Sequence, residues 1–261
     1  MSSSSSTPVL PSLPSFRLDG RTALVTGAGR GIGAAAAAAL AQAGAAVTLA
    51  ARSRDELQTV AAAIKERGGR ATVLPLDVTD SAAVRERIAQ SGPFDILVNS
   101  AGTNRPALLA DTPDSDIDAV TALNLKSTLY VTREVARGMV AGRRGGSIIT
   151  VSSQMGHVGG PRRTLYCATK HAMEGMAKAL AWELGPQGIR VNTLCPTFIE
   201  TAMTAGMFRD EGFREFVTSR IALGRVGQLS DIMGAVVFLA SEASAMVTGS
   251  ALMVDGGWTA A

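Results

Sequence analysis

From residue 16 onward, short runs of apolar residues alternate with longer segments whose apolar residues recur at helical spacing. The apolar runs predict strands at 23–27, 45–51, 71–78, 95–102, 146–153 and 189–196, with a further segment at 250–257. The segments between them predict helices at 31–44, 53–69, 80–92, 111–142, 164–184 and 230–244. Strands that are apolar along their whole length favour a parallel sheet with helices on both faces. The pattern predicts an α/β fold, a single domain built on a doubly wound parallel sheet of about seven strands.

The first 15 residues, MSSSSSTPVLPSLPS, differ in composition from the rest of the chain. They contain neither the basic region nor the apolar core of a secretory signal, so we expect a disordered tail at 1–15 and the domain at 16–261. The most apolar later window, 31–51, is interrupted at Gln42 and Gly44 and is too short to span a membrane. We therefore expect a cytoplasmic protein with no membrane contact.

Charge and cysteine content exclude further classes. The net charge is +3 and the basic residues are scattered, which does not indicate nucleic-acid binding. The two cysteines, Cys167 and Cys195, form neither a disulfide framework nor a metal-ligand spacing. We expect both to be small buried thiols and predict no metal site.

A glycine-rich turn follows the first predicted strand, with the sequence TGAGRGIG at 26–33. Glycines at 27, 31 and 33 allow a tight turn and a close approach of the backbone to a pyrophosphate, which then rests on the helix N-terminus. Glycine also closes turns that bind nothing, but this turn lies between a strand and a helix, as a dinucleotide site requires. The spacing differs from the common GxGxxG.

Tyr166 and Lys170 lie one turn apart on one face of the predicted helix 164–184, for which Thr164 is the expected N-cap. A free tyrosine has a pKa of about 10 and transfers protons poorly near neutral pH, whereas a neighbouring cation stabilises the phenolate. Lys170 alone would supply only part of the required shift, so a second cation, such as an oxidised nicotinamide, would be needed. The Ser153 hydroxyl, at the end of the preceding strand, is expected alongside.

These residues occur in an order that resembles the short-chain dehydrogenase/reductase family of the classical type, over almost everything from Phe16 to Trp258. The glycine-rich turn is similar to the family's TGxxxGxG, and 99–102 (NSAG) to its NNAG, with Ser100 in place of the second Asn. Asn124 occupies the position of the family's active-site Asn, and Ser153 precedes Tyr166 by the family's spacing. The resemblance implies a Rossmann fold. One departure is Pro196-Thr197, where the family usually has Pro-Gly.

The resemblance also implies a role for each matching residue. Tyr166 would be the general acid/base, Ser153 would hydrogen-bond the same substrate oxygen, and Asn124 would hold a proton-relaying water. Asn124 could equally be a helix-interior side chain bonded to a backbone kink. Lys170 would bind the nicotinamide ribose and depress the Tyr166 pKa. The cofactor-binding positions are Gly27, Arg30, Gly31, Ile32, Gly33, Arg52, Asp77, Val78, Asn99, Ala101, Gly102, Tyr166, Lys170, Pro196, Ile199 and Thr201.

The end of the second predicted strand indicates which dinucleotide is preferred. In dinucleotide folds an acid at this point accepts the ribose 2′-hydroxyl of NAD, but here Ala51 is followed by Arg52. Arg52, with Arg30 from the glycine-rich turn, could hold the 2′-phosphate of NADP. If both arginines are solvated instead, the pocket accepts either cofactor. We predict a preference for NADP(H), with NAD(H) possible.

The substrate side is less defined by the sequence. Residues 197–223 correspond to the family's variable substrate lid, or alternatively to a surface helix pair on the sheet edge. His157 is a candidate substrate contact or a loop anchor, and Arg162 and Arg163 could hold a substrate carboxylate or phosphate or form a solvated pair. The physiological substrate remains open: a sugar or polyol, a 3-oxoacyl thioester or a xenobiotic ketone.

Three functions remain in view. The first is an NADP(H)-preferring ketoreductase or alcohol dehydrogenase that interconverts a ketone and a secondary alcohol. The second is an NAD-dependent sugar or polyol dehydrogenase of the same family, and the third a dinucleotide-binding sensor or scaffold without activity. By resemblance the partner is a small-molecule substrate and the assembly a homotetramer. The long helix containing Asn124 and the Tyr166 helix would pair between subunits.

Overall fold

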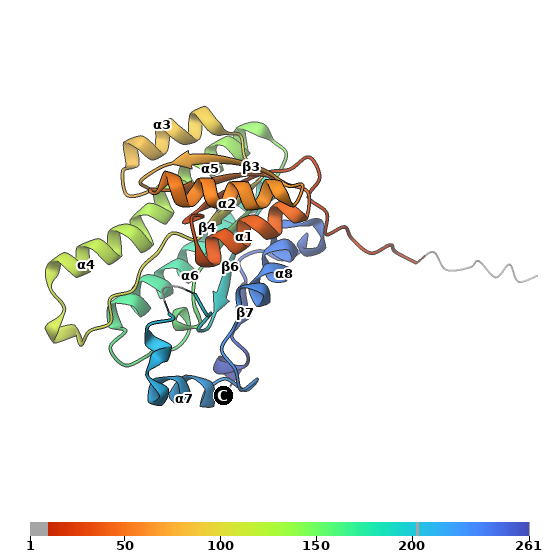
Figure 1. The fold of residues 1–261 in the computed structure, drawn as a ribbon. Coiled ribbons are helices and arrows are strands. Elements are labelled where there is room, and N and C mark those ends of the chain that lie inside the picture. Colours follow the sequence, from red (N-terminus) through yellow and green to blue (C-terminus); the bar gives the residue numbers. More distant parts are fainter. Residues whose placement is uncertain (1–9, 202–203, 261) are drawn as a thin grey trace, which may run out of the picture.

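The computed structural model describes residues 10–201 and 204–260, which contain one all-parallel sheet of seven strands (Figure 1). The strand order is β3-β2-β1-β4-β5-β6-β7. The strands are β1 (Thr22–Thr26), β2 (Ala46–Ala51), β3 (Arg70–Pro75), β4 (Ile96–Asn99), β5 (Gly146–Val151), β6 (Ile189–Pro196) and β7 (Ala251–Val254). The predicted fold class is confirmed. Residues 1–9 of the predicted tail, 202–203 of the predicted lid and residue 261 lie outside the described residues.

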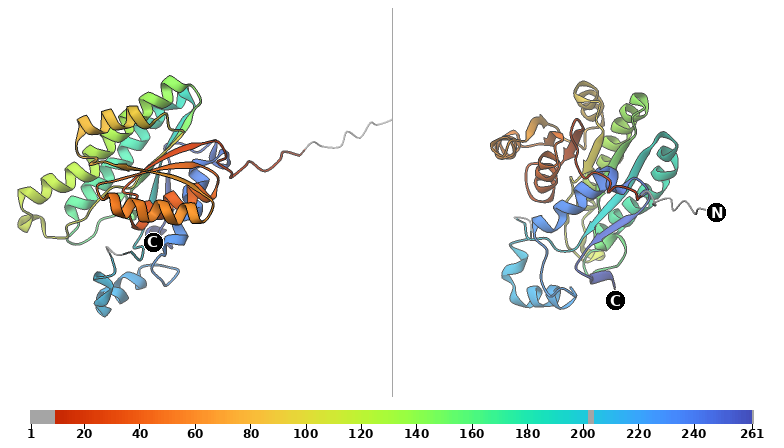
Figure 2. Two further views of the ribbon diagram at one scale, coloured as in Figure 1. Left: turned by 45° about the horizontal axis from the view of Figure 1, so that its top comes forward. Right: turned by 90° about the vertical axis from the view of Figure 1, so that its right-hand side faces the viewer.

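Helices cover both faces of the sheet, as the apolar strands required. They are α1 (Gly31–Gln42), α2 (Arg54–Glu66), α3 (Ser81–Ser91), α4 (Asp114–Thr121), α5 (Ser127–Gly142), α6 (Thr164–Leu184), α7 (Glu211–Ser219) and α8 (Leu229–Ala240). One apolar core joins α1, α2 and α8 to the sheet, and a second joins α3, α5 and α6 to its other face (Figure 2). No helix in the described part of the chain combines the length and apolarity needed to cross a membrane.

The packing on each face follows from small and branched side chains. On the α1 face, alanines along α1 bring that helix close to the sheet, and Leu40 is fully buried beside Val236 of α8. On the other face, Val84, Val135 and Ala177 contribute to the core from three different helices. Each fully buried aliphatic side chain contributes about 1.5–3 kcal/mol through the apolar surface removed from water. The sheet is therefore anchored from both sides, which fixes the positions of its loops.

The order of the strands determines where a ligand site can form. From β1 the chain builds outward through β2 and β3, then returns to place β4 on the other side of β1. The loops after β1 and β4 therefore leave in opposite directions and open a crevice at the carboxyl ends of the strands. The glycine-rich turn follows β1 at this point.

Most predicted elements have shifted ends, and three of the differences have a clear local cause. β3 ends at Pro75, not at Val78, because Asp77 accepts hydrogen bonds from the Thr79 amide and hydroxyl and turns the chain away from the sheet. Thr164 is not an N-cap, since the Arg163 carbonyl already accepts the Cys167 amide and Thr164 is the first helical residue.

The third difference concerns the long helix predicted at 111–142. Its helical part begins at Asp114, and a π-helical turn, Ala122–Lys126, separates α4 from α5. Next to this turn the Ser127 and Thr128 hydroxyls donate to the carbonyls of Leu123 and Asn124, at 2.6 and 2.7 Å. Such hydroxyl bonds to the preceding turn bend helices, and π-turns occur often at functional sites.

The segment between β6 and α8 projects from the carboxyl end of the sheet (Figures 1 and 2). It contains α7 and a short helical turn, Met207–Arg209, held together by an aromatic cluster. Phe198 lies at the centre, with ring centroids 5.7–6.2 Å from those of Phe208, Phe213 and Trp258. Trp258 connects the segment to the C-terminal end of the chain, whereas Phe216 on α7 is exposed. A lid function for residues 197–223 stays a prediction.

Candidate active site

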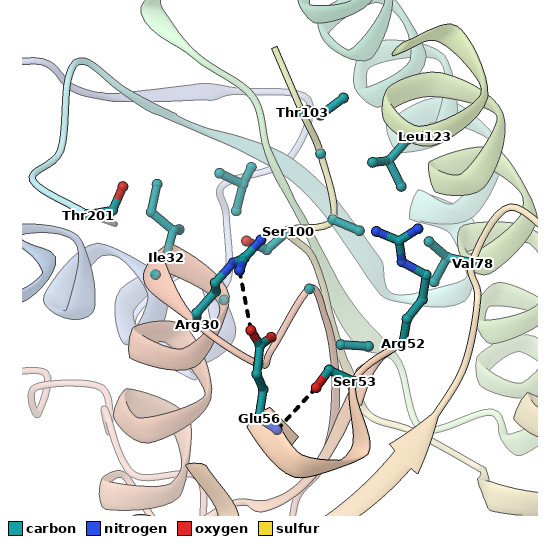
Figure 3. Close-up of a pocket in the computed structure, with 18 of the residues that line it drawn as sticks. Arg30, Ile32, Arg52, Ser53, Glu56, Val78, Ser100, Thr103, Leu123 and Thr201 are labelled. Carbon is teal, nitrogen blue, oxygen red and sulfur yellow. Dashed lines mark hydrogen bonds and ion pairs between the residues drawn. The ribbon is translucent and has the colours of Figure 1, made fainter. Parts of the chain in front are cut away.

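The crevice at the carboxyl ends of β1 to β5 holds a cavity of about 470 Å³ (Figure 3). Thirteen residues that the sequence assigned to a cofactor or catalytic role line it: Gly27, Arg30, Gly31, Ile32, Gly33, Arg52, Asp77, Val78, Ala101, Gly102, Tyr166, Lys170 and Thr201. Five others lie outside the lining: Asn99, Asn124, Ser153, Pro196 and Ile199. The glycine-rich turn and the Tyr166–Lys170 pair, 133 residues or more apart in the chain, thus share one cavity.

The glycine-rich turn has no room for side chains at two of its positions. A Cβ on Gly33 would stand 2.2 Å from the Gly27 carbonyl oxygen, and one on Gly27, at φ +64°, would stand 2.9 Å from the backbone of Ala101. Arg30 offers no side-chain cap to α1, so the first N–H groups of this helix remain available. This geometry fits the pyrophosphate of a dinucleotide, which such N–H groups hold.

Two arginines, Arg30 and Arg52, line the cavity and differ in their surroundings. Arg30 Nη1 is 3.2 Å from Glu56 Oε1, whereas the Arg52 side chain extends along the cavity toward Val78 and Leu123 (Figure 3). Among the described residues Arg52 has no ion-pair partner within 4.0 Å. Arg52 is thus the more available of the two cations. Glu56, to which the sequence analysis gave no role, forms an ion pair with Arg30.

The residues that the resemblance assigns to adenine binding, Asp77 and Val78, line the cavity just after β3. Asp77 accepts from the Thr79 amide at 2.9 Å and from its hydroxyl at 2.7 Å. These bonds, assisted by the charge of Arg52, hold the pKa of Asp77 below its usual range. On the opposite wall, the buried Oδ1 of Asn104 has no hydrogen-bond partner among the described residues. An acceptor left free on the cavity wall is available to a donor on a ligand.

Tyr166 and Lys170 lie together on the first turns of α6, as predicted. The Lys170 Nζ is 5.4 Å from the centroid of the Tyr166 ring, and it donates to the Val151 carbonyl at 2.8 Å. The Lys170 side chain is buried, and this burial lowers its pKa to about 8. The ammonium form therefore still predominates at neutral pH.

The expected depression of the Tyr166 pKa by Lys170 is not found. Burial of the phenol raises the pKa of Tyr166 above its ordinary value, and the groups that oppose this effect are the Ser153 hydroxyl and the Arg163 charge. Lys170 does not contribute because its ammonium is directed at the Val151 carbonyl. The sequence argument called for a second cation, besides Lys170, to favour the phenolate of Tyr166. The Arg163 charge has this effect, and it belongs to the protein itself.

Ser153 is held in place by its neighbours in the turn after β5. Its hydroxyl accepts from the Met155 amide at 3.1 Å and donates to Gln154 Oε1 at 2.7 Å. Gln154 is itself buried. Sequence reasoning missed Gln154, because nothing in the motif marks a residue whose amide orients the serine hydroxyl.

Asn124 lies in the π-helical turn, fully buried, and its side chain bridges two elements. Its Oδ1 accepts from the Thr103 amide at 2.8 Å, and its Nδ2 donates to the Thr103 carbonyl at 2.9 Å and to the Thr169 hydroxyl at 3.1 Å. Thr169 in turn donates to the Tyr166 carbonyl at 2.8 Å. These bonds are made to the loop after β4 and to α6, not to the backbone kink of the helix that contains Asn124, and they tie that loop to α6. The role of Asn124 in holding a water stays a prediction.

The other three predicted residues outside the lining serve the backbone around the cavity. Asn99 donates to the hydroxyls of Thr132 and Thr150, which joins β4 to α5 and β5. Pro196 ends β6 in register with Val254, and Ile199 forms a bridge with Gly227. Thr197, the departure from Pro-Gly, keeps its amide bonded to the Val254 carbonyl at 3.3 Å. The presence of Thr197 therefore does not displace the backbone from the edge of β7.

The loop before α6 contains the candidate substrate contacts. Arg162 is exposed and has a φ of 61°, whereas Arg163 is only 8% exposed and its Nη1 has no partner among the described residues. The solvated-pair interpretation is therefore wrong for Arg163. His157 faces Glu174 and Cys195. Cys195 is buried as predicted, while Cys167 is only partly buried.

Comparison with known proteins agrees with this geometry. The family model described as enoyl-(acyl carrier protein) reductase matches residues 27–259. Gluconate 5-dehydrogenase of Gluconobacter oxydans (strain 621H) is 38% identical over 94% of this chain and 96% of its own length. The 3-oxoacyl-[acyl-carrier-protein] reductase of Thermotoga maritima is 40% identical over 92% of this chain and 98% of its own length.

Solved structures show the same relationship. A gluconate 5-dehydrogenase from Burkholderia cenocepacia J2315, in complex with NADP and tartrate, is 39% identical to this chain with a TM-score of 0.91, and the match covers 95% of this chain and 99% of that one. The fold and the cavity define a dinucleotide-binding oxidoreductase. The chain belongs to the short-chain dehydrogenase/reductase family.

Proposed function

We propose that the protein is an NADP(H)-preferring oxidoreductase that interconverts a ketone and a secondary alcohol, with Tyr166 as general acid/base. The observation that carries this proposal is that Tyr166, Lys170, Arg52 and the glycine-rich turn line one and the same cavity. The B. cenocepacia relative was solved with NADP, which supports the same cofactor here. When bound, the nicotinamide supplies or accepts the hydride.

The protein's own residues handle the proton and the substrate oxygen. In the reducing direction the Tyr166 phenol, whose raised pKa keeps it protonated, donates its proton to the developing alkoxide. Ser153 donates a hydrogen bond to the same oxygen, for which its one hydroxyl proton must turn from Gln154 Oε1 to the substrate. In the oxidising direction Tyr166 must first lose its proton, and the Arg163 charge favours that step.

The main alternative is an NAD-dependent sugar or polyol dehydrogenase. The observation that favours it is Glu56, an acid on the cavity wall that neutralises Arg30 and would repel a 2′-phosphate. A sensor or scaffold without activity is disfavoured, because the residues proposed for proton transfer are all present and both the Lys170 ammonium and the Ser153 hydroxyl lie next to Tyr166.

The decisive experiment follows nicotinamide absorbance with purified protein, NADPH or NADH, and a panel of sugar ketones, sugar acids, 3-oxoacyl thioesters and simple ketones. Turnover of at least one carbonyl substrate, faster with NADPH, is the expected result. Turnover only with NADH would favour the alternative, and cofactor binding without turnover across the panel would favour the sensor.

A buried guanidinium next to the proposed acid/base predicts the charge of the substrate. Arg163 lies three residues before Tyr166, and its Nη1 has no partner within the described part of the chain, so a substrate carboxylate would find a charge-assisted bond there. We expect Arg163→Gln to raise KM for a sugar acid about 10-fold or more, with little change for a neutral ketose. The exposed neighbour provides the control, Arg162→Gln. Equal changes for both substrates in Arg163→Gln would show that Arg163 serves only to hold the loop.

The lowered pKa of Lys170 predicts a pH dependence for cofactor binding. Below about pH 8 the Lys170 ammonium is present, and as pH rises through about 8 the charge is lost. If Lys170 binds the nicotinamide ribose, the affinity for NADPH should weaken along this limb while Tyr166 stays protonated. Fluorescence titration from about pH 6 to about pH 10 measures the affinity for NADPH. The role of Lys170 would be contradicted if the NADPH affinity did not change across this pH range. It would also be contradicted if Lys170→Met showed the same loss of affinity at high pH.

The exposed apolar residues of the helices fit the homotetramer that the resemblance implies. Trp182 on α6 is 87% exposed and Leu129 on α5 is 45% exposed. We propose that these helices pair between subunits, and expect a tetramer mass by light scattering at micromolar concentration. Trp182→Glu should lower the assembly state, whereas Leu13→Glu, in the exposed N-terminal segment, should not. A monomer mass for the wild type would reject the assembly.

A further inference from the structure

A cluster of three potential metal ligands lies behind the proposed active site. His157 follows the turn after β5, Glu174 is on α6 one turn beyond Lys170, and Cys195 is in β6. Their ligand atoms lie within 4.8 Å of one another. The residues are 17 and 21 positions apart in the chain, and so match no short metal-binding motif. This cluster is absent from the cavity lining and has no part in the proposed reaction.

The distances in the cluster suit a small tetrahedral cation. His157 Nε2 is 3.5 Å from Glu174 Oε2 and 3.5 Å from Cys195 Sγ, and Cys195 Sγ is 3.4 Å from Glu174 Oε1. Zinc binds sulfur at about 2.3 Å and nitrogen or oxygen at about 2.0–2.2 Å, which separates tetrahedral ligands by about 3.3–3.6 Å. A zinc ion would therefore need only small side-chain movements.

The surroundings of Glu174 also favour the binding of a cation. Its side chain is 8% exposed, and among the described residues no lysine or arginine lies within 4.0 Å of it. Among the described residues its carboxylate accepts from the Thr193 hydroxyl at 2.7 Å and the Cys195 thiol at 3.4 Å, with His157 beside it and the Lys170 charge one helical turn away. A buried carboxylate without a full counter-charge is costly, and a divalent cation would offset that cost.

The kinds of ligand select the metal. Thiolate and imidazole favour zinc over magnesium or calcium, which take oxygen ligands. Cys195 and Glu174 are buried, but the His157 side chain is 31% exposed, which leaves an entry path and a fourth position for water. As the Sγ–metal bond forms, the thiol proton is released to solvent.

We propose that His157, Glu174 and Cys195 form a binding site for one zinc ion. The ion would join β6, the catalytic helix and the loop that begins at Ser153. Gly156 allows this approach, since a Cβ there would stand 3.2 Å from Glu174 Oε1. The site would thus stabilise the loop that connects Ser153 to Tyr166.

The chain contains a matched control for each of two ligands, because it has only two histidines and two cysteines. Tag-free, full-length protein is stripped with a chelator, loaded with zinc, freed of unbound metal and measured for zinc per chain. Cobalt(II) loading tests for thiolate ligation through its charge-transfer absorption. The expected result is one zinc per chain and a thiolate–cobalt band in the wild type, in Cys167→Ser and in His171→Gln.

The ligand variants give the other half of the test. Cys195→Ser should lose the thiolate–cobalt band, and His157→Gln should weaken zinc binding about 10-fold or more. Saturating zinc should raise the thermal midpoint of the wild type by about 5–10 °C and that of His157→Gln much less. If Cys195→Ser fails to fold, His157→Gln still tests the zinc site, because it is altered at an exposed side chain. Substoichiometric zinc in the wild type, or unchanged binding in His157→Gln, overturns the proposal.

Discussion

Replacing Tyr166 by phenylalanine is expected to lower kcat about 10²–10⁴-fold while cofactor binding stays close to that of the wild type. The substitution removes only the hydroxyl that exchanges a proton with the substrate oxygen. The ring, and its contact with the Lys170 ammonium at 5.4 Å, is retained. The measurement is kcat by nicotinamide absorbance, together with the NADPH affinity by fluorescence titration.

Tyr130→Phe is the matched control, because Tyr130 on α5 is the only other tyrosine and lies outside the cavity lining. It should leave kcat unchanged. If Tyr166→Phe retains substantial turnover, another group transfers the proton and the assignment of Tyr166 fails. A loss of NADPH affinity equal to the loss of kcat would instead show that the variant disturbs the cofactor site.

Hydrophobic patterning predicted the fold because parallel strands buried on both faces are apolar throughout, and this signal is local in the chain. It predicted the six major strands within a few residues and the seventh as the segment 250–257. It could not predict the π-helical turn at Asn124, because the bonds that accompany this turn, from the Ser127 and Thr128 hydroxyls and between Asn124 and Thr103, form only in the folded chain. The Asp77–Thr79 bonds that end β3 were likewise hidden within an apolar run.

The site was predictable to the extent that its residues are grouped in short motifs. The glycine-rich turn and the Tyr166–Lys170 pair each lie within one element, and the cavity joins them as expected. Glu56 was missed because its pairing with Arg30 crosses from α2 to the turn after β1. The burial of Arg163, and therefore its influence on the Tyr166 pKa, depends on tertiary packing that no motif encodes.

The preference for NADP(H) is expected to depend on Arg52 more than on Arg30. Glu56 already pairs with Arg30, whereas Arg52 has no ion-pair partner in the part of the chain that the structure describes and extends along the cavity (Figure 3). A charged hydrogen bond contributes about 1.5–3 kcal/mol, so Arg52→Ala should lower kcat/KM for NADPH about 10–150-fold with little effect on NADH. Arg30→Ala should have a smaller effect.

A control and a converse variant make this comparison specific. Arg54 begins α2 two residues after Arg52 but does not line the cavity, so Arg54→Ala should leave the ratio of kcat/KM values for NADPH and NADH unchanged. Glu56→Gln should raise that ratio, because it removes a carboxylate that repels the 2′-phosphate and releases Arg30 to bind it. A wild type that prefers NADH, or an unchanged ratio in Arg52→Ala, would show that Arg52 does not hold the phosphate.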